Sequence, residues 1–222
     1  MATQPAQIAS VLRRLRLEGV GRGQIDALKA IGREFHRRGW AVGSSSNFSL
    51  RLSNEPLRVL ITASGKDKGR LGDEDFAVVD GDGAPVDPML PAPSAETLLH
   101  TVICNATDAG AVLHIHSVGA TVLSDRHGDA GGLWIEGYEM LKGLRDVTSH
   151  EHREWVEIFE NTQDMDDLSR RVAARLADGD NPRQHGFLLR RHGMYSWGRD
   201  VEEAQRHVEV FEFLFEVLAR GA

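Results

Sequence analysis

Cysteine is nearly absent from this chain of 222 residues, and its scarcity excludes whole classes of site. Cys104 is the only cysteine, so an internal disulfide and a zinc site built from several cysteines are both excluded. Cys104 lies in the apolar run TLLHTVIC, which predicts a buried thiol. Any metal that the protein binds must therefore be held by histidine and carboxylate side chains.

Long hydrophobic runs and an excess of positive charge are missing as well. No segment approaches the roughly 18 consecutive apolar residues of a membrane span, and the N-terminus has no basic segment followed by an apolar signal core. We therefore expect a cytoplasmic protein with no membrane partner. The formal net charge is −7, with basic residues scattered among acidic ones. Binding to nucleic acid is accordingly not expected.

Internal repeats, low-complexity tracts and convincing linkers are also missing. The polar segment 177–184 is short enough to be a surface loop. Hydrophobic residues make up 41% of the chain and charged residues 27%, which are ordinary globular proportions. We therefore expect a single domain over residues 1–222, because an α/β chain of this length can build one core.

Hydrophobic periodicity and turn residues predict α/β structure, with an antiparallel meander over residues 47–86. A helix with Ser94 as its N-cap is expected to follow the meander, and Asp200 is expected to cap the last helix. The remaining strands are predicted at 111–116, 155–159, 187–191 and 195–197. The remaining helices are predicted at about 6–17, 24–38, 118–124, 165–177 and 201–219.

Two histidines, His114 and His116, lie in the apolar run AVLHIHSVGA. On a strand, side chains at i and i+2 point to the same face, so both imidazoles can reach one ion. A catalytic zinc generally has three protein ligands and one open position. His192 is the best candidate for the third ligand, because it follows an apolar strand and precedes Gly193, where a tight turn can aim the ring into a cleft.

A packed pair of hydrogen-bonded core histidines is the alternative, since an H-x-H pair alone is a weak signal. A rival pair, His150 and His152, has charged and unpatterned flanks and is predicted to lie in a solvated turn. The other histidines have no ligand-like partner in the sequence and are assigned to the surface or the core: His36, His100, His127, His185 and His207.

Several separated motifs occur in the order and spacing of the class II aldolase and adducin head family, which the chain resembles over nearly its whole length. These motifs are VLHIHS, SSSNFS, TASGK, PSAET and RRHG. Within the family, EGYEMLKG, FENT and RRHGMYSWG resemble the branch that dehydrates methylthioribulose 1-phosphate in methionine salvage. The resemblance implies a three-layer αβα fold around a mainly antiparallel sheet, assembled as a homotetramer with active sites near subunit interfaces.

The resemblance also implies a bound Zn²⁺, with His114, His116 and His192 as its ligands. Glu96, in PSAET, matches the acid/base carboxylate of the aldolases, and Glu139, in YEMLK, matches the acid/base position of the dehydratases. A glutamate in a first helical turn is also favoured by the helix dipole alone. Which of the two glutamates moves the substrate proton therefore stays open.

The resemblance assigns the substrate phosphate to small-residue loops, where backbone N–H groups and hydroxyls can surround an anion. Ser46 stands where the aldolases commonly have glycine, and Ala95 where they often have a second serine. The phosphate contacts of the aldolases therefore cannot all be transferred to this chain. Lys68 can add positive charge, although a solvated surface lysine is its default interpretation. The implied phosphate-binding residues are Ser46, Asn47, Ser64, Gly65, Ser94 and Lys68.

The implied reaction removes water from a small phosphorylated ketose, beginning with the proton at C3 beside the C2 ketone. A bound Zn²⁺ supplies the polarisation of the ketone, and a glutamate with a raised pKa takes the proton. Zinc ligands alone do not distinguish this reaction from that of a sugar-phosphate aldolase or epimerase. A non-catalytic adducin-like interaction domain is a third alternative, but such a domain has no need of three converging histidines.

Overall fold

A single eight-stranded sheet organises the computed structural model, which describes residues 22–178 and 184–221. The strands are β1 (Asn47–Asn54), β2 (Leu57–Thr62), β3 (Phe76–Asp80), β4 (Ala111–Ile115), β5 (Gly132–Glu136), β6 (Arg153–Phe159), β7 (Gly186–Leu189) and β8 (Gly193–Gly198). Their order in the sheet is β3-β2-β1-β4-β8-β7-β6-β5. Only β6 and β7 pair in parallel. The predicted meander and the mainly antiparallel sheet are therefore confirmed.

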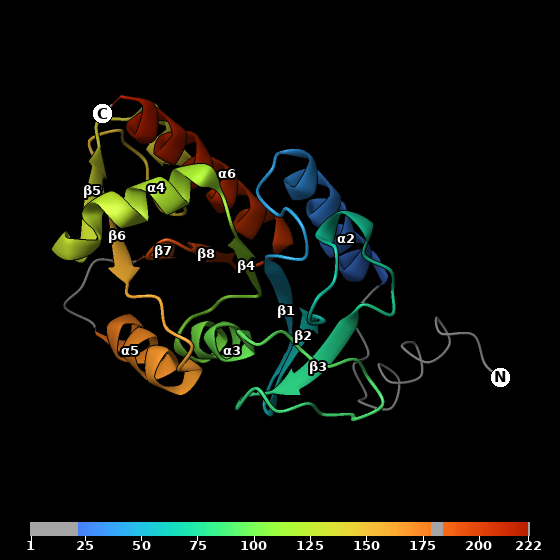
Figure 1. Ribbon diagram of the computed structural model, residues 1–222. Coiled ribbons are helices and arrows are strands. Elements are labelled where there is room, and N and C mark those ends of the chain that lie inside the picture. Colours follow the sequence, from blue (N-terminus) through green and yellow to red (C-terminus); the bar gives the residue numbers. More distant parts are fainter. Residues whose placement is uncertain (1–21, 179–183, 222) are drawn as a thin grey trace.

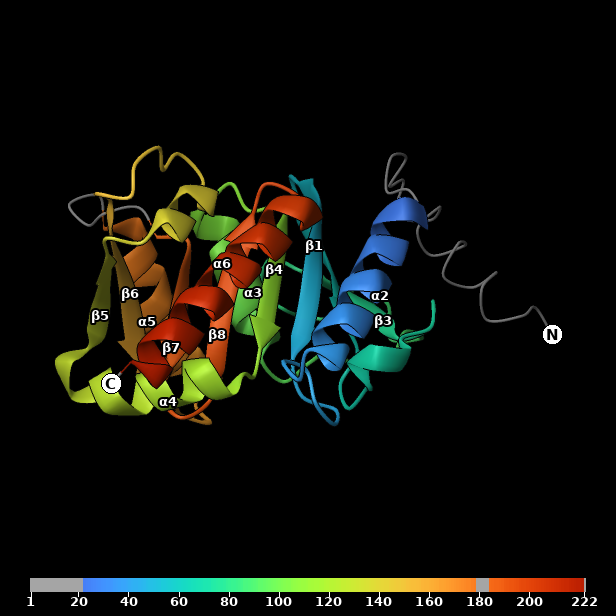
Figure 2. The same ribbon diagram turned by 90° about the horizontal axis from the view of Figure 1, so that it is seen from above.

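Helices cover both faces of this sheet. They are α2 (Arg22–Arg37), α3 (Thr97–Ala106), α4 (Val118–His127), α5 (Met165–Ala177) and α6 (Val201–Arg220), with short 3₁₀ helices η1 (Lys68–Arg70), η2 (Gly128–Ala130) and η3 (Glu139–Gly143). Figures 1 and 2 show α2, α4 and α6 on one face and α3 and α5 on the other. The predicted three-layer αβα arrangement is confirmed, while the predicted helix 6–17 lies outside the described residues.

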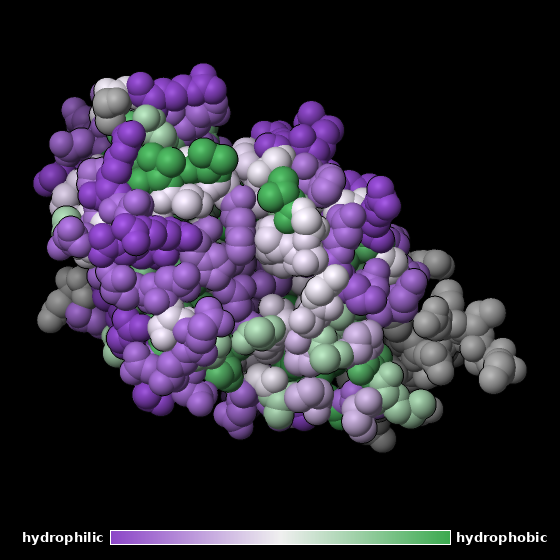
Figure 3. All heavy atoms as spheres, viewed as in Figure 1, coloured by the Kyte–Doolittle hydropathy of each residue, from purple (hydrophilic) through white to green (hydrophobic). Residues whose placement is uncertain are grey.

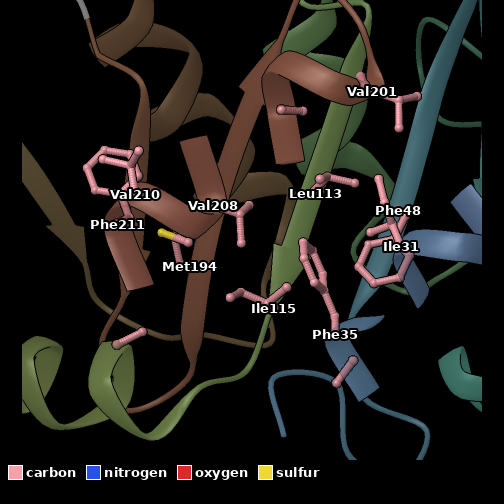
Figure 4. Packing of buried hydrophobic residues seen from close by; sticks show 14 of the residues in the cluster. Ile31, Phe35, Phe48, Leu113, Ile115, Met194, Val201, Val208, Val210 and Phe211 are labelled. Carbon is pink, nitrogen blue, oxygen red and sulfur yellow. The ribbon is translucent and has the colours of Figure 1, made fainter. Parts of the chain in front are cut away.

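Alternation along β4 divides its side chains between two hydrophobic cores. Leu113 and Ile115 belong to the core beneath α2 and α6, where Figure 4 shows them beside Phe35 and Phe48. Val112 belongs to the second core, which packs against α3 and α5. Because side chains at i and i+2 share a face, His114 points to the same side as Val112. A strand with both faces buried thus carries the first histidine of the predicted site.

Helix ends mostly follow their predicted signals, with one correction. Gly39 has a φ of +78° just after α2, and the Asp200 side chain accepts the Glu203 N–H at the start of α6, both as predicted. The prediction that Ser94 is the N-cap of α3 is wrong, because α3 begins at Thr97 with Glu96 in the N-cap position. Ser94 Oγ accepts the Glu96 N–H at 3.3 Å instead, within the preceding turn. The Glu96 side chain makes no capping bond and is free to point elsewhere.

The edge strand β5 was not predicted from the sequence. Its segment GLWIE is short, and only Leu133 and Ile135 face the core, while Trp134 is exposed. β5 completes the sheet by pairing with β6. None of the helices within the described residues combines the length and apolar composition that a membrane span requires.

Candidate metal centre

Four side chains that can bind a metal converge where β4 ends and β8 begins. Glu96 precedes α3, His114 lies in β4, His116 follows β4, and His192 precedes β8. One ligand atom from each of the four residues lies within 4.8 Å of all the others. The structure thus brings together the three histidines that the sequence indicated, although β4 ends at Ile115, one residue before His116, whereas the predicted strand included His116.

The Nε2 atoms of the three histidines face one another. His116 Nε2 lies 2.8 Å from His114 Nε2 and 3.0 Å from His192 Nε2. The Glu96 carboxylate closes the group, with oxygens 3.4 Å from His114 Nε2 and 3.3 Å from His192 Nε2. Three imidazole nitrogens and a carboxylate are a donor set that suits a zinc-like divalent cation.

Hydrogen bonds at the far side of two rings fix their tautomers. His114 Nδ1 donates to the Met194 carbonyl at 3.0 Å, and His192 Nδ1 donates to Asn161 Oδ1 at 3.3 Å. Both partner atoms are acceptors only, so each Nδ1 carries the hydrogen and each Nε2 carries a lone pair directed at the group. Such partners are typical of metal-binding histidines. The tautomers therefore fit a bound cation.

Burial keeps these imidazoles uncharged. The pKa of His114 is lowered well below its ordinary value by burial first, and then by His116 and His192. Burial, followed by the charges of His192 and Lys68, lowers the pKa of His116 to about 4. Both rings are consequently neutral at pH 7, which is the protonation state that binds metals.

The turn between β7 and β8 positions His192 differently from the sequence prediction. The left-handed residue of this turn is Arg191, with φ of +54°, whereas Gly193 is the first residue of β8. Gly193 is needed for another reason, because a Cβ there would lie 2.1 Å from the Ile115 carbonyl oxygen. The absence of a side chain lets β8 approach β4 and brings His192 to the other two histidines.

Glu96 is held by Asn47 and is only partly accessible. Asn47 Nδ2 donates to Glu96 Oε2 at 2.8 Å and to Ser94 Oγ at 3.0 Å. The Glu96 side chain is 17% exposed. Asn47 therefore fixes one carboxylate oxygen of Glu96 by a hydrogen bond, while the carboxylate stays close to the histidines.

Glu139 lies outside this group. Its side chain is 71% exposed on η3, 2.5 Å from Lys142 Nζ and 3.7 Å from His150 Nδ1. The hydrogen bond and charge of Lys142 lower the pKa of Glu139. The raised pKa expected for a catalytic base is therefore not found at Glu139 within a single chain, because this carboxylate is solvated and paired. The rival histidines His150 and His152 also lie outside the group.

The predicted phosphate-binding residues lie on three loops. Ser46 is buried, has a φ of +71° and donates through Oγ to the Trp40 carbonyl. A left-handed residue here explains why glycine suits this position in the aldolases. The second loop carries Ser64, whose N–H donates to the Ala92 carbonyl, followed by Gly65 with φ of +70°.

The default interpretation of Lys68 as a surface lysine is wrong. Lys68 is 1% exposed, and its Nζ donates to the carbonyls of Lys66 at 2.6 Å and Ser44 at 3.3 Å. Burial lowers its pKa to about 8. The carbonyl of Ser44 joins this ammonium to the loop that leads to Ser46 and Asn47, so a cation lies beneath the small-residue loops.

Asn161 and Tyr195 support the site, but sequence reasoning did not place either of them beside the histidines. Asn161 belongs to the FENT motif, and the parallel pairing of β6 with β7 carries it to His192. Tyr195 is fully buried, and its ring stacks on that of His114. The sequence indicates only that Tyr195 lies on a strand shortly after His192. This position does not reveal which ring Tyr195 contacts.

Known proteins resemble this chain in sequence and in fold. The family described as Class II Aldolase and Adducin N-terminal domain matches residues 26–219. Methylthioribulose-1-phosphate dehydratase of Xanthomonas campestris pv. campestris (strain 8004) is 47% identical over 183 residues, 82% of each chain. The protein of the same name from Persephonella marina is 41% identical over 194 residues, covering 87% of this chain and 88% of that one. An L-fuculose 1-phosphate aldolase structure matches with a TM-score of 0.72 and 21% identity, over 91% of this chain and 88% of that one.

Proposed function

The chain belongs to the class II aldolase and adducin N-terminal domain family, and from that premise we propose that it is a methylthioribulose-1-phosphate dehydratase. The proposed reaction converts 5-methylthioribulose 1-phosphate to 5-methylthio-2,3-dioxopentyl phosphate and water, a step of methionine salvage. The observation that carries the proposal is the convergence of three imidazole Nε2 atoms beside Glu96. The relatives that share 41–47% identity over most of the chain bear this enzyme's name.

The proposed metal is Zn²⁺, held by His114, His116 and His192. Zinc accepts imidazole nitrogen at roughly 2.0–2.1 Å and is commonly bound by three protein ligands in catalytic sites. When bound, the ion supplies Lewis-acid polarisation of the substrate's ketone and hydroxyl oxygens. The Nδ1 hydrogen bonds of His114 and His192 hold their rings ready for it.

Two carboxylates divide the proton transfers in this proposal. Dehydration needs a base for the C3 proton and an acid for the departing C4 hydroxyl. Glu96 is the base, because it lies against the histidines and Asn47 holds one of its oxygens. Glu139 is the acid. It is exposed and lies outside the histidine group of its own chain, so this role requires that it act in the site of a neighbouring subunit, where burial raises its pKa.

The small-residue loops bind the phosphate in this proposal. Lys68 lies beneath them and contributes a buried positive charge that favours a dianion. Asn47 and Ser94 are already hydrogen-bonded to each other beside Glu96, which keeps this part of the binding surface rigid. The proposed contacts are Ser46, Asn47, Ser64, Gly65, Ser94 and Lys68.

A homotetramer in the cytoplasm is the proposed form of the enzyme. Apolar side chains that a second copy can cover support assembly, since Val118 is 79% exposed and Val42 is 54% exposed. Figure 3 shows small hydrophobic groups over α4 on a face that is otherwise mostly hydrophilic. The cytoplasmic location is favoured by the use of a single, buried cysteine, Cys104.

Incubation of the zinc-loaded protein with methylthioribulose 1-phosphate tests the proposed reaction. Mass spectrometry should detect loss of one water, and fuculose and ribulose phosphates should remain unchanged. Cleavage to a three-carbon phosphate would instead identify an aldolase. In deuterated solvent, Glu139→Gln should still exchange the C3 hydrogen without losing water, whereas Glu96→Gln should do neither. The reverse pattern would exchange the two assigned roles.

A further inference from the structure

A chain of buried hydrogen bonds leads from Glu96 into the layer between the sheet and α3. Asn47 joins Glu96 to His100, whose Nε2 contacts Asn47 Oδ1. On the other side of the ring, His100 Nδ1 lies 2.7 Å from Ser49 Oγ. His100 and Ser49 are fully buried, so this relay of Ser49, His100 and Asn47 is shielded from water.

The direction of every hydrogen bond in the relay follows from Glu96. A carboxylate only accepts, so the Asn47 atom facing Glu96 must be the amide nitrogen, and Asn47 Oδ1 must face His100. The oxygen accepts from His100 Nε2, which therefore carries the ring hydrogen. His100 Nδ1 is then the acceptor for the Ser49 hydroxyl. One arrangement of hydrogens satisfies the whole relay.

His100 can keep this arrangement because its ring stays neutral. Burial lowers the pKa of His100 to about 3, and Tyr195, whose ring centroid lies 5.6 Å away, presents an uncharged edge. A neutral imidazole has one donor and one acceptor, and the relay uses both. Burial of an apolar side chain at this position would cost less desolvation free energy than burial of the polar ring. The imidazole is therefore expected to have a role besides packing.

We propose that His100 is a positioning residue that acts through Asn47 to orient the Glu96 carboxylate beside the three histidines. The proposal rests on the proposed role of Glu96 as the base. Without the hydrogen of His100 Nε2, the Asn47 amide is held only through its nitrogen, by Glu96 and Ser94, and its oxygen loses the donor that keeps it turned away from Glu96. The contact that fixes Glu96 would then be weakened.

Two amide substitutions at His100 test the proposal as a matched pair. His100→Gln extends far enough to replace the Nε2 donor to Asn47, whereas His100→Asn carries the same group on a side chain one methylene shorter. His100→Gln should keep kcat within about threefold of wild type. His100→Asn should lower kcat about 10- to 100-fold, as expected for a misplaced catalytic group, with an unchanged KM and zinc content. Equal kcat values for the two variants would overturn the proposal.

A measurement made without substrate distinguishes failure of this proposal from failure of the proposed reaction. The visible absorption spectrum of the Co²⁺-loaded protein reports the surroundings of the metal. His100→Asn should change this spectrum in the same direction as Glu96→Gln, and His100→Gln should match wild type. This pattern would support the relay even if wild type failed to dehydrate methylthioribulose 1-phosphate. A wild-type spectrum for His100→Asn would overturn it. If His100→Asn does not fold, Ser49→Ala takes its place, with a smaller change of the same sign expected.

Discussion

The ring of Tyr195 lies parallel to the imidazole of His114, with centroids 4.0 Å apart and planes inclined by 15°. Phe187 stacks on the other face of Tyr195, with centroids 5.0 Å apart and planes inclined by 16°. All three residues are fully buried in the sheet. The His114 ring is thus fixed by a hydrogen bond to Met194 at Nδ1 and by a continuous aromatic stack across its face.

Substitution of Tyr195 should separate the contribution of the ring from that of the hydroxyl. The hydroxyl lies near the Glu96 carboxylate but forms no well-aligned hydrogen bond within the described part of the chain, so Tyr195→Phe should change the free energy of unfolding by less than about 1 kcal/mol. Tyr195→Leu removes the stack and should cost about 2 kcal/mol or more, with weaker zinc binding. Urea denaturation and zinc competition titrations measure both effects. Wild-type zinc affinity in Tyr195→Leu would show that the stack does not hold His114.

Asn161 should control metal affinity although it contacts no metal itself. It accepts the Nδ1 hydrogen of His192 and so keeps the Nε2 lone pair directed at the site. Asn161→Ala should weaken zinc binding about 10- to 100-fold, as is usual for partners of metal-binding histidines. Gln163→Ala, two residues further on, is the matched control. Equal zinc affinities of the two variants, measured by competition with a chelator, would contradict this prediction.

Glu212 should make the protein less stable as the pH rises. Burial raises the pKa of Glu212 to about 7 from 4.5, although it accepts the Ser117 hydroxyl hydrogen at 2.7 Å. Because the folded-state pKa is raised, this contribution to stability is fully present below pH 4.5 and is lost as the pH passes 7. Glu212→Gln stays uncharged at every pH. Its free energy of unfolding, relative to that of wild type, should therefore rise by about 3 kcal/mol between pH 4 and pH 8. Urea denaturation at fixed zinc concentration measures the difference, and parallel pH profiles for the two proteins would contradict it.

Glu139 should act across a subunit boundary. Glu139→Gln retains the three histidines, and His116→Ala retains Glu139, so each variant alone should be inactive. Co-expression of the two, with different affinity tags, should produce mixed oligomers that recover dehydratase activity. The control replaces His116→Ala by the double variant, which lacks both groups and should restore nothing. Inactive mixed oligomers would place the action of Glu139 within its own chain or remove its role.

The sequence allowed prediction of the fold because local patterns and the final packing agree. The apolar run of β4 and the helical period of α2 are read directly from neighbouring residues. The short edge strand β5 was missed because five residues with two buried side chains carry little periodic signal. Ser94 was misassigned as an N-cap because the chain makes an extra turn before α3 begins.

The convergence of the three histidines was predictable, whereas the residues that support them were not. The spacing of His114 and His116 has a geometric meaning on one strand, and so it could be recognised without a structure. Asn161, His100 and Tyr195 act through contacts between strands that are distant in sequence. Lys68 was read as a surface lysine because its burial depends on loops whose conformation no local pattern specifies.

The antiparallel pairing of β4 with β8 joins residues of the centre that are far apart in the sequence. His114 and His116 emerge from the ribosome long before His192, and a nascent chain that stops at Leu189 offers two imidazoles and no turn to complete them. The group of four side chains is therefore complete only after most of the polypeptide has been translated and β4 has paired with β8.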